Sequence, residues 1–175
     1  RPFEELLDLL EHAATVSTPV DTMDPLFTSQ ADYEAFSARH QAMAVPTVDL
    51  ATYTGPAYLG IDAGSTTTKM VLIDPDCNLL YSFYHSNQGN PVSIVLPQLR
   101  EIYAQCGGRV TIQGAAVTGY GEDLIKNAFS CDLGLVETVA HLNAARHFTP
   151  DVDFIIDIGG QDMKCFKIRN GAVDS

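Results

Sequence analysis

Residues 59–69 read Leu-Gly-Ile-Asp-Ala-Gly-Ser-Thr-Thr-Thr-Lys, an apolar segment that ends in an aspartate and runs into a glycine and four hydroxyl side chains. The glycine lets backbone approach a phosphate closely, and the N–H and O–H groups after it are donors for an anion. Asp62 is placed to hold Mg²⁺ through water. The GxxxxGK[ST] pattern of a P-loop is absent, so a different phosphate turn is predicted. A plain hairpin with a threonine-rich second strand is the alternative.

Residues 154–164, Phe-Ile-Ile-Asp-Ile-Gly-Gly-Gln-Asp-Met-Lys, repeat this pattern of apolar strand, aspartate and glycine about 95 residues later. Two such hairpins facing each other could clamp the β- and γ-phosphates of a nucleotide with Mg²⁺ between them. Phosphoryl transfer needs mainly positioning and charge neutralisation, which Asp62 and Asp157 would supply. Two unrelated β-turns are the alternative, because Asp-Gly is common turn chemistry.

A third segment, residues 116–122 (Ala-Val-Thr-Gly-Tyr-Gly-Glu), is a strand that enters a glycine-rich turn before a helix. Gly119 could bring backbone near the nucleotide, or it could serve only a sharp strand-to-helix turn. Both interpretations stay open from the sequence.

Hydrophobic periodicity and turn residues predict an α/β domain over residues 57–175 after a helical and linker appendage over residues 1–56. The element order favours a mixed five-stranded sheet with helices packed on it. Helices are expected at 2–14, from Ser29 to about residue 44, and at 91–105, 122–128 and 137–148. Strands are expected at 57–61, 70–73, 79–84, 110–117, 154–158, 163–168 and 172–174.

The 175-residue chain carries a net charge of −12, which disfavours nucleic acid and anionic membrane surfaces as partners. It has no apolar run of the roughly 20 residues that span a bilayer. Four irregularly spaced cysteines, Cys77, Cys106, Cys131 and Cys165, are expected to be reduced thiols of a cytoplasmic protein. Because the chain starts with Arg1 and stops without an ending signal, we expect a piece of a longer polypeptide.

The three motifs together resemble the BadF/BadG/BcrA/BcrD-type ATPases, which include activators of 2-hydroxyacyl-CoA dehydratases and belong to the actin/Hsp70/sugar-kinase superfamily. Residues 60–69 are similar to the first phosphate motif, 118–121 to the connecting motif, and 157–162 with Lys164 to the second phosphate motif. The resemblance covers about residues 58–175. It implies a ribonuclease-H-like half of an actin-like ATPase domain.

The resemblance also implies an ATP-binding and ATP-hydrolysing activator that drives electron transfer into a dehydratase-like or reductase-like partner. Asp62 and Asp157 would then act on Mg²⁺ and water, and Gln161 would orient the attacking water. The residues expected to contact the nucleotide are Gly64, Ser65, Thr66, Thr67, Lys69, Gly119, Gly159 and Gly160.

Family activators are dimers that share a [4Fe–4S] cluster, but Ala140 stands where the small activators have a ligand cysteine before the residue matching His141. We therefore expect no cluster on this chain, although a longer parent, dimeric or multi-domain, could hold one. His141 is expected to be structural. The alternatives are a non-catalytic interaction module and a small-molecule kinase. The chain alone is expected to be inactive, because half of the nucleotide contacts would be missing.

Overall fold

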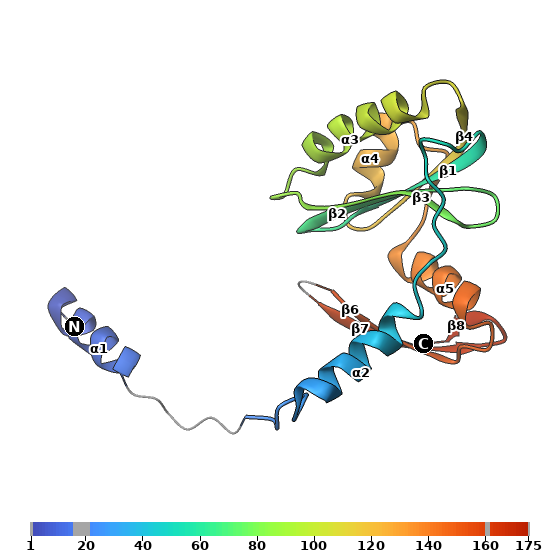
Figure 1. Ribbon diagram of the computed structural model, residues 1–175. Helices are drawn as coiled ribbons and strands as arrows, with labels where there is room; N and C mark the ends of the chain where they lie inside the picture. Colours follow the sequence, from blue (N-terminus) through green and yellow to red (C-terminus); the bar gives the residue numbers. More distant parts are fainter. Residues whose placement is uncertain (1, 16–21, 160–161, 175) are drawn as a thin grey trace. The chain divides into compact units, whose positions relative to one another are not determined.

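The computed structural model describes residues 2–15, 22–159 and 162–174, and the chain groups into two compact units, residues 1–44 and 45–175 (Figure 1). The predicted Gly160 and Gln161 therefore lie outside the described residues. The connector expected at 47–56 belongs to the second unit, since Leu50 is buried in its core.

The first unit holds two helices, α1 (Phe3–Thr15) and α2 (Gln30–Gln41). Ser29 caps α2 as expected, because its hydroxyl accepts a hydrogen bond from the Asp32 N–H at 3.2 Å. Helix α2 ends at Gln41, a few residues before the predicted end near residue 44.

The second unit contains a mixed five-stranded sheet, which confirms the predicted fold class. The order is β3-β2-β1-β4-β5, with β1–β2 and β2–β3 antiparallel and β1–β4 and β4–β5 parallel. The strands are β1 (Gly55–Ala63), β2 (Thr67–Ile73), β3 (Leu79–Ser86), β4 (Val110–Thr118) and β5 (Leu133–Gly134).

The fifth strand of this sheet is the two-residue β5, which sequence reasoning missed. The predicted strand at 154–158 instead opens a separate three-stranded antiparallel sheet of β6 (Phe154–Ile158), β7 (Met163–Arg169) and β8 (Ala172–Asp174). Local periodicity identified these strands but held no information about their partners, because pairing is set by residues distant in the chain.

Helices α3 (Pro91–Cys106) and α4 (Glu122–Phe129) contact one side of the five-stranded sheet, and α5 (Glu137–Phe148) lies on the other side (Figure 1). Asn90 caps α3, whose first residue is Pro91, and Gly107 ends it in the left-handed conformation at φ 54°. These start and stop signals match the predicted bounds.

The main core lies between the five-stranded sheet and helices α3 and α4. Alternate residues of β1 and β2 point into it, so Ile61, Met70 and Leu72 are buried while Val71 is partly exposed. A smaller core joins α5 to the second sheet through Leu142, Phe166 and Ile168. None of the described helices combines the length and hydropathy that a bilayer crossing requires.

Two neighbouring residues of β2 allow a direct test of this assignment. Met70→Ala is expected to lower the free energy of unfolding by about 2–5 kcal/mol, because it leaves a cavity in a fully buried site. Val71→Ala, on the opposite face, is expected to cost less than about 1 kcal/mol. Urea titrations of both variants measure the difference, and equal losses would contradict the assigned strand register.

Candidate functional site

The carboxyl ends of β1 and β4 lie side by side, and the two predicted motifs that follow them are in contact. Asp62 pairs with Thr118 in the parallel register, and the Gly121 N–H donates to the Ala63 carbonyl at 2.8 Å. A Cβ on Gly119, whose φ is +91°, would lie 2.6 Å from Asp62 Oδ1. The third motif thus does bring backbone against the aspartate of the first.

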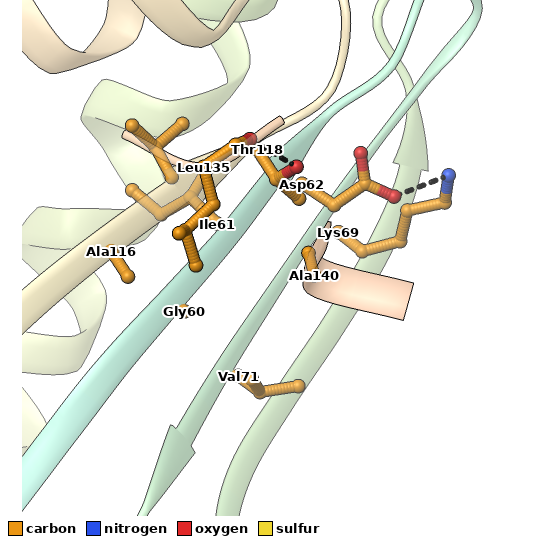
Figure 2. A pocket seen from close by; sticks show the side chains of 10 residues that line it. Gly60, Ile61, Asp62, Lys69, Val71, Ala116, Thr118, Leu135 and Ala140 are labelled. Carbon is orange, nitrogen blue, oxygen red and sulfur yellow. Dashed lines mark hydrogen bonds and ion pairs between the residues drawn. The ribbon is translucent and has the colours of Figure 1, made fainter. Parts of the chain in front are cut away.

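Asp62 has one paired and one unpaired oxygen. Oδ2 accepts an ion-paired hydrogen bond from Lys69 Nζ at 3.0 Å, with both side chains partly buried (Figure 2). Oδ1 is buried and has no hydrogen-bond partner among the described residues. An unpaired buried carboxylate oxygen is costly, so this atom suits a cation or a bound water.

The turn after Asp62 is held by Asn87, a residue that the sequence motifs did not single out. Its amide donates to the Gly64 carbonyl at 2.7 Å and to Thr68 Oγ1 at 3.3 Å, and its backbone N–H donates to the Thr66 carbonyl at 2.9 Å. Asn87 is almost fully buried. Ser65 and Thr66 stay exposed on this anchored turn, so their N–H and O–H groups are available to an anion.

A cavity of about 540 Å³ brings the first and second phosphate motifs together. The first hairpin contributes Gly64, Ser65, Thr66, Thr67 and Lys69, and the second contributes Gly159, Asp162 and Lys164. The remaining lining residues are Gly119 and Tyr120 of the connecting turn, Glu122 at the start of α4, and Val136 and Glu137 at the start of α5. The described residues that the sequence analysis predicted to contact the nucleotide therefore share one cavity.

The walls of this cavity carry both signs of charge. Lys69 and Lys164 oppose the carboxylates of Glu122, Glu137 and Asp162. Lys164 Nζ donates a hydrogen bond to Glu137 Oε2 at 3.0 Å and lies 3.2 Å from Asp162 Oδ2. These contacts raise the pKa of the Lys164 ammonium, and the hydrogen bond to Glu137 is the larger cause. The lysine stays charged at neutral pH, but the walls as a whole are not net positive.

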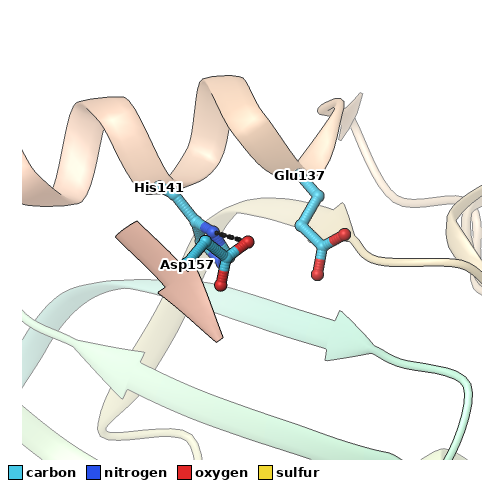
Figure 3. A group of neighbouring side chains, drawn as sticks. All are labelled: Glu137, His141 and Asp157. Atoms are coloured by element: carbon cyan, nitrogen blue, oxygen red, sulfur yellow. Dashed lines mark hydrogen bonds and ion pairs between the residues drawn. The ribbon is translucent and has the colours of Figure 1, made fainter. Parts of the chain in front are cut away.

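Asp157 is positioned by α5. Its Oδ2 lies 3.0 Å from His141 Nδ1, and Glu137 one turn earlier on α5 completes a group of three possible metal ligands (Figure 3). His141 thus has a partner, as a structural histidine would. Asp62 and Asp157 have different partners, the Lys69 ammonium and the His141 imidazole, and a Mg²⁺ ion shared between the two aspartates stays a prediction.

The cysteines do not form a cluster site. Cys106 and Cys131 are buried, and burial raises the pKa of both thiols, which disfavours the thiolate that iron requires. Among the described residues, the one candidate ligand group contains no cysteine. Ala140 lines a small, largely apolar cavity of about 270 Å³ beside Gly60 and Val71 (Figure 2). The residues present therefore do not fit a [4Fe–4S] cluster.

The architecture is that of half of an actin-like ATPase domain: a mixed five-stranded sheet with helices on both sides and two acid-tipped hairpins. Comparison with known proteins specifies the family. Residues 59–175 match the BadF/BadG/BcrA/BcrD ATPase family, and the chain belongs to it.

Three relatives illustrate the similarity. An uncharacterised protein of Methanocaldococcus jannaschii is 37% identical over 116 residues, covering 66% of this chain and 45% of that protein. A 2-hydroxyisocaproyl-CoA dehydratase activator of Clostridioides difficile is 32% identical over 113 residues, covering 64% of this chain and 41% of that protein. Among solved structures, this chain is similar to the activator of the 2-hydroxyisocaproyl-CoA dehydratase from Clostridium difficile with bound ADPNP. The two are 29% identical with a TM-score of 0.53, and the match covers 67% of this chain and 43% of that protein. The chain spans less than half the length of these relatives.

Asn87 and Glu137 are among the site residues that sequence reasoning did not select. Asn87 follows the expected third strand without any motif, so its role becomes visible only when the chain has folded back on residues 64–68. Glu137 could have been found from the sequence. It lies four residues before His141 in a predicted helix, and this spacing places both side chains on one face of the helix.

Replacing Asn87 with alanine tests the anchoring of the phosphate turn. We expect Asn87→Ala to lower the free energy of unfolding by about 1–3 kcal/mol, because buried backbone and side-chain groups lose their partner. Amide hydrogen exchange of residues 64–67 should also become faster. Asn143→Ala, on the exposed side of α5, is the control and should change neither quantity.

Gly119→Ala tests the contact between the first and third motifs. Both Gly119 and Gly108 have positive φ, but a Cβ would meet Asp62 and Ala63 at the first position and open space at the second. Gly108→Ala is expected to cost about 1–2 kcal/mol from backbone strain alone. Gly119→Ala should cost about 1–3 kcal/mol more from the steric clash, measured by thermal or urea unfolding. Equal losses would show that the close approach is absent.

Proposed function

We propose that this chain forms the phosphate-binding part of an ATPase that drives electron transfer to a 2-hydroxyacyl-CoA dehydratase-like enzyme. The cavity shared by the first and second phosphate motifs is the observation that carries this proposal. Membership of an ATPase family and similarity to a protein described as a dehydratase activator support it. The cytoplasm, where its four cysteines stay reduced, is the proposed location.

In this proposal, different residues contact different parts of Mg·ATP. The exposed Ser65 and Thr66 on the turn anchored by Asn87 donate N–H and O–H groups to the terminal phosphates. Lys69 and Lys164 offset phosphate charge from the two hairpins. Mg²⁺, when bound, neutralises further phosphate charge, and Asp62 with its unpaired Oδ1 and Asp157 are its proposed anchors through water. Gln161 keeps its predicted role with the attacking water.

A non-catalytic docking module is the second candidate. It is favoured by one observation: Asp62 and Asp157 each already have a side-chain partner, Lys69 and His141 respectively. Phosphate release from ATP by a protein that includes this chain distinguishes the two candidates, because a docking module has no turnover.

Nucleotide binding by the 175-residue chain is tested by NMR titration with Mg·ATP. We expect Mg·ATP to change the amide chemical shifts of residues 64–67 and Gly119. The affinity should be weak, because the chain spans less than half the length of its relatives. The chemical-shift changes should disappear when EDTA removes the cation. Asp62→Asn should weaken binding about tenfold or more, equivalent to at least about 1.4 kcal/mol.

Asp151→Asn is the matched control, since Asp151 is an exposed acid outside the cavity. The proposal fails if Mg·ATP leaves these amides unchanged at millimolar concentration, or if Asp62→Asn and Asp151→Asn bind alike.

A further inference from the structure

Three side chains from α5 and β6 converge beside the 540 Å³ cavity, which Glu137 lines. Glu137, His141 and Asp157 each present one possible ligand atom, and these atoms lie within 4.8 Å of one another (Figure 3). All three residues are partly buried.

The convergence follows from the two elements that carry the residues. Glu137 and His141 are four residues apart on α5, so their side chains leave the same face of the helix. Asp157 lies on the face of β6 that also carries Ile155, which packs with Leu142 of α5 in the smaller core. The three groups are therefore held by a packed helix and strand rather than by loops, which favours a preorganised site.

We propose that Glu137, His141 and Asp157 form a binding site for a divalent transition-metal ion of the Zn²⁺, Fe²⁺, Mn²⁺ or Co²⁺ class. Imidazole nitrogen is a ligand that zinc and iron accept readily, whereas Mg²⁺ prefers oxygen ligands alone. Two carboxylates and one neutral imidazole carry a charge of −2, which balances the ion. Three protein ligands leave coordination positions for water or a further ligand, as in catalytic rather than structural metal sites.

One pair of atoms in the group already has the spacing of neighbouring metal ligands. Metal–ligand distances of about 2.0–2.2 Å place neighbouring ligand atoms roughly 3.0–3.5 Å apart, and His141 Nδ1 already lies 3.0 Å from Asp157 Oδ2. Loss of the shared imidazole proton would turn this hydrogen bond into one edge of the coordination shell.

Lys164 is the competitor for the third ligand. Its ammonium lies 3.0 Å from Glu137 Oε2 and 3.2 Å from Asp162 Oδ2. When Glu137 binds a metal ion, Lys164 keeps Asp162 as its ion-pair partner, so no unpaired ammonium is left behind. Because the ammonium competes with the metal ion for Glu137, removing it should strengthen metal binding.

This site goes beyond the proposed ATPase function, because it requires no nucleotide. It shares Asp157 with the proposed Mg²⁺ contacts, whereas His141 belongs to the transition-metal site alone. Measurements without ATP keep the two proposals separate: either can fail while the other stands.

The test is Zn²⁺ titration of the full chain by calorimetry without nucleotide, together with visible spectra of the Co²⁺ form. We expect one ion per chain that millimolar Mg²⁺ does not displace, and a Co²⁺ spectrum without sulfur-to-cobalt charge transfer. His141→Ala and Glu137→Gln should each weaken Zn²⁺ binding at least about tenfold. Lys164→Met should strengthen it.

His147→Ala is the matched control, because His147 lies on the same helix outside the ligand group and should leave Zn²⁺ affinity unchanged. Circular dichroism of each variant confirms that α5 is intact. The proposal is overturned if the wild-type chain binds no Zn²⁺, if His141→Ala and His147→Ala bind equally, or if the Co²⁺ spectrum reports thiolate ligands.

Discussion

The parallel pairing of β1 with β4 is the constraint on which the candidate site depends. It brings the carboxyl ends of two strands to one edge of the sheet, so Asp62 lies opposite Thr118 and the turn at Gly119 lies against Ala63. Ligand sites of open α/β sheets form at such carboxyl ends, where loops diverge and leave space. No side chain fits at Gly119, and the Gly121 hydrogen bond to Ala63 closes the contact.

Around this edge, the acidic character of the chain shapes the chemistry. A protein with a net charge of −12 cannot hold a polyphosphate by excess positive charge, and the cavity walls carry three carboxylates beside two lysines. The two lysines alone therefore do not balance the charge of a polyphosphate, and the proposed function assigns the remainder to backbone N–H groups and a cation. In that proposal, the carboxylates that repel phosphate are also the groups that attract the cation.

Helix α5 connects the two halves of the site. It begins with Glu137 at the wall of the 540 Å³ cavity, presents His141 to Asp157, and buries Leu142 against the second sheet. The same helix also carries Ala140 beside the first sheet. Residues at the start of α5 therefore lie beside both hairpins, through the cavity that Glu137 lines and the contact of His141 with Asp157.

The sequence by itself determined most local structure of the domain. Helix α5 and strands β6 and β8 begin and end where predicted, because proline, glycine and periodic apolar residues act over a few neighbours. The acid-tipped hairpins were also readable, since each motif is contiguous. Only the tertiary structure decided that β6 leaves the five-stranded sheet, that Leu133–Gly134 joins it, and that Asn87 anchors the turn at Gly64. Those features depend on pairing and burial between residues far apart in the chain, which no local pattern records.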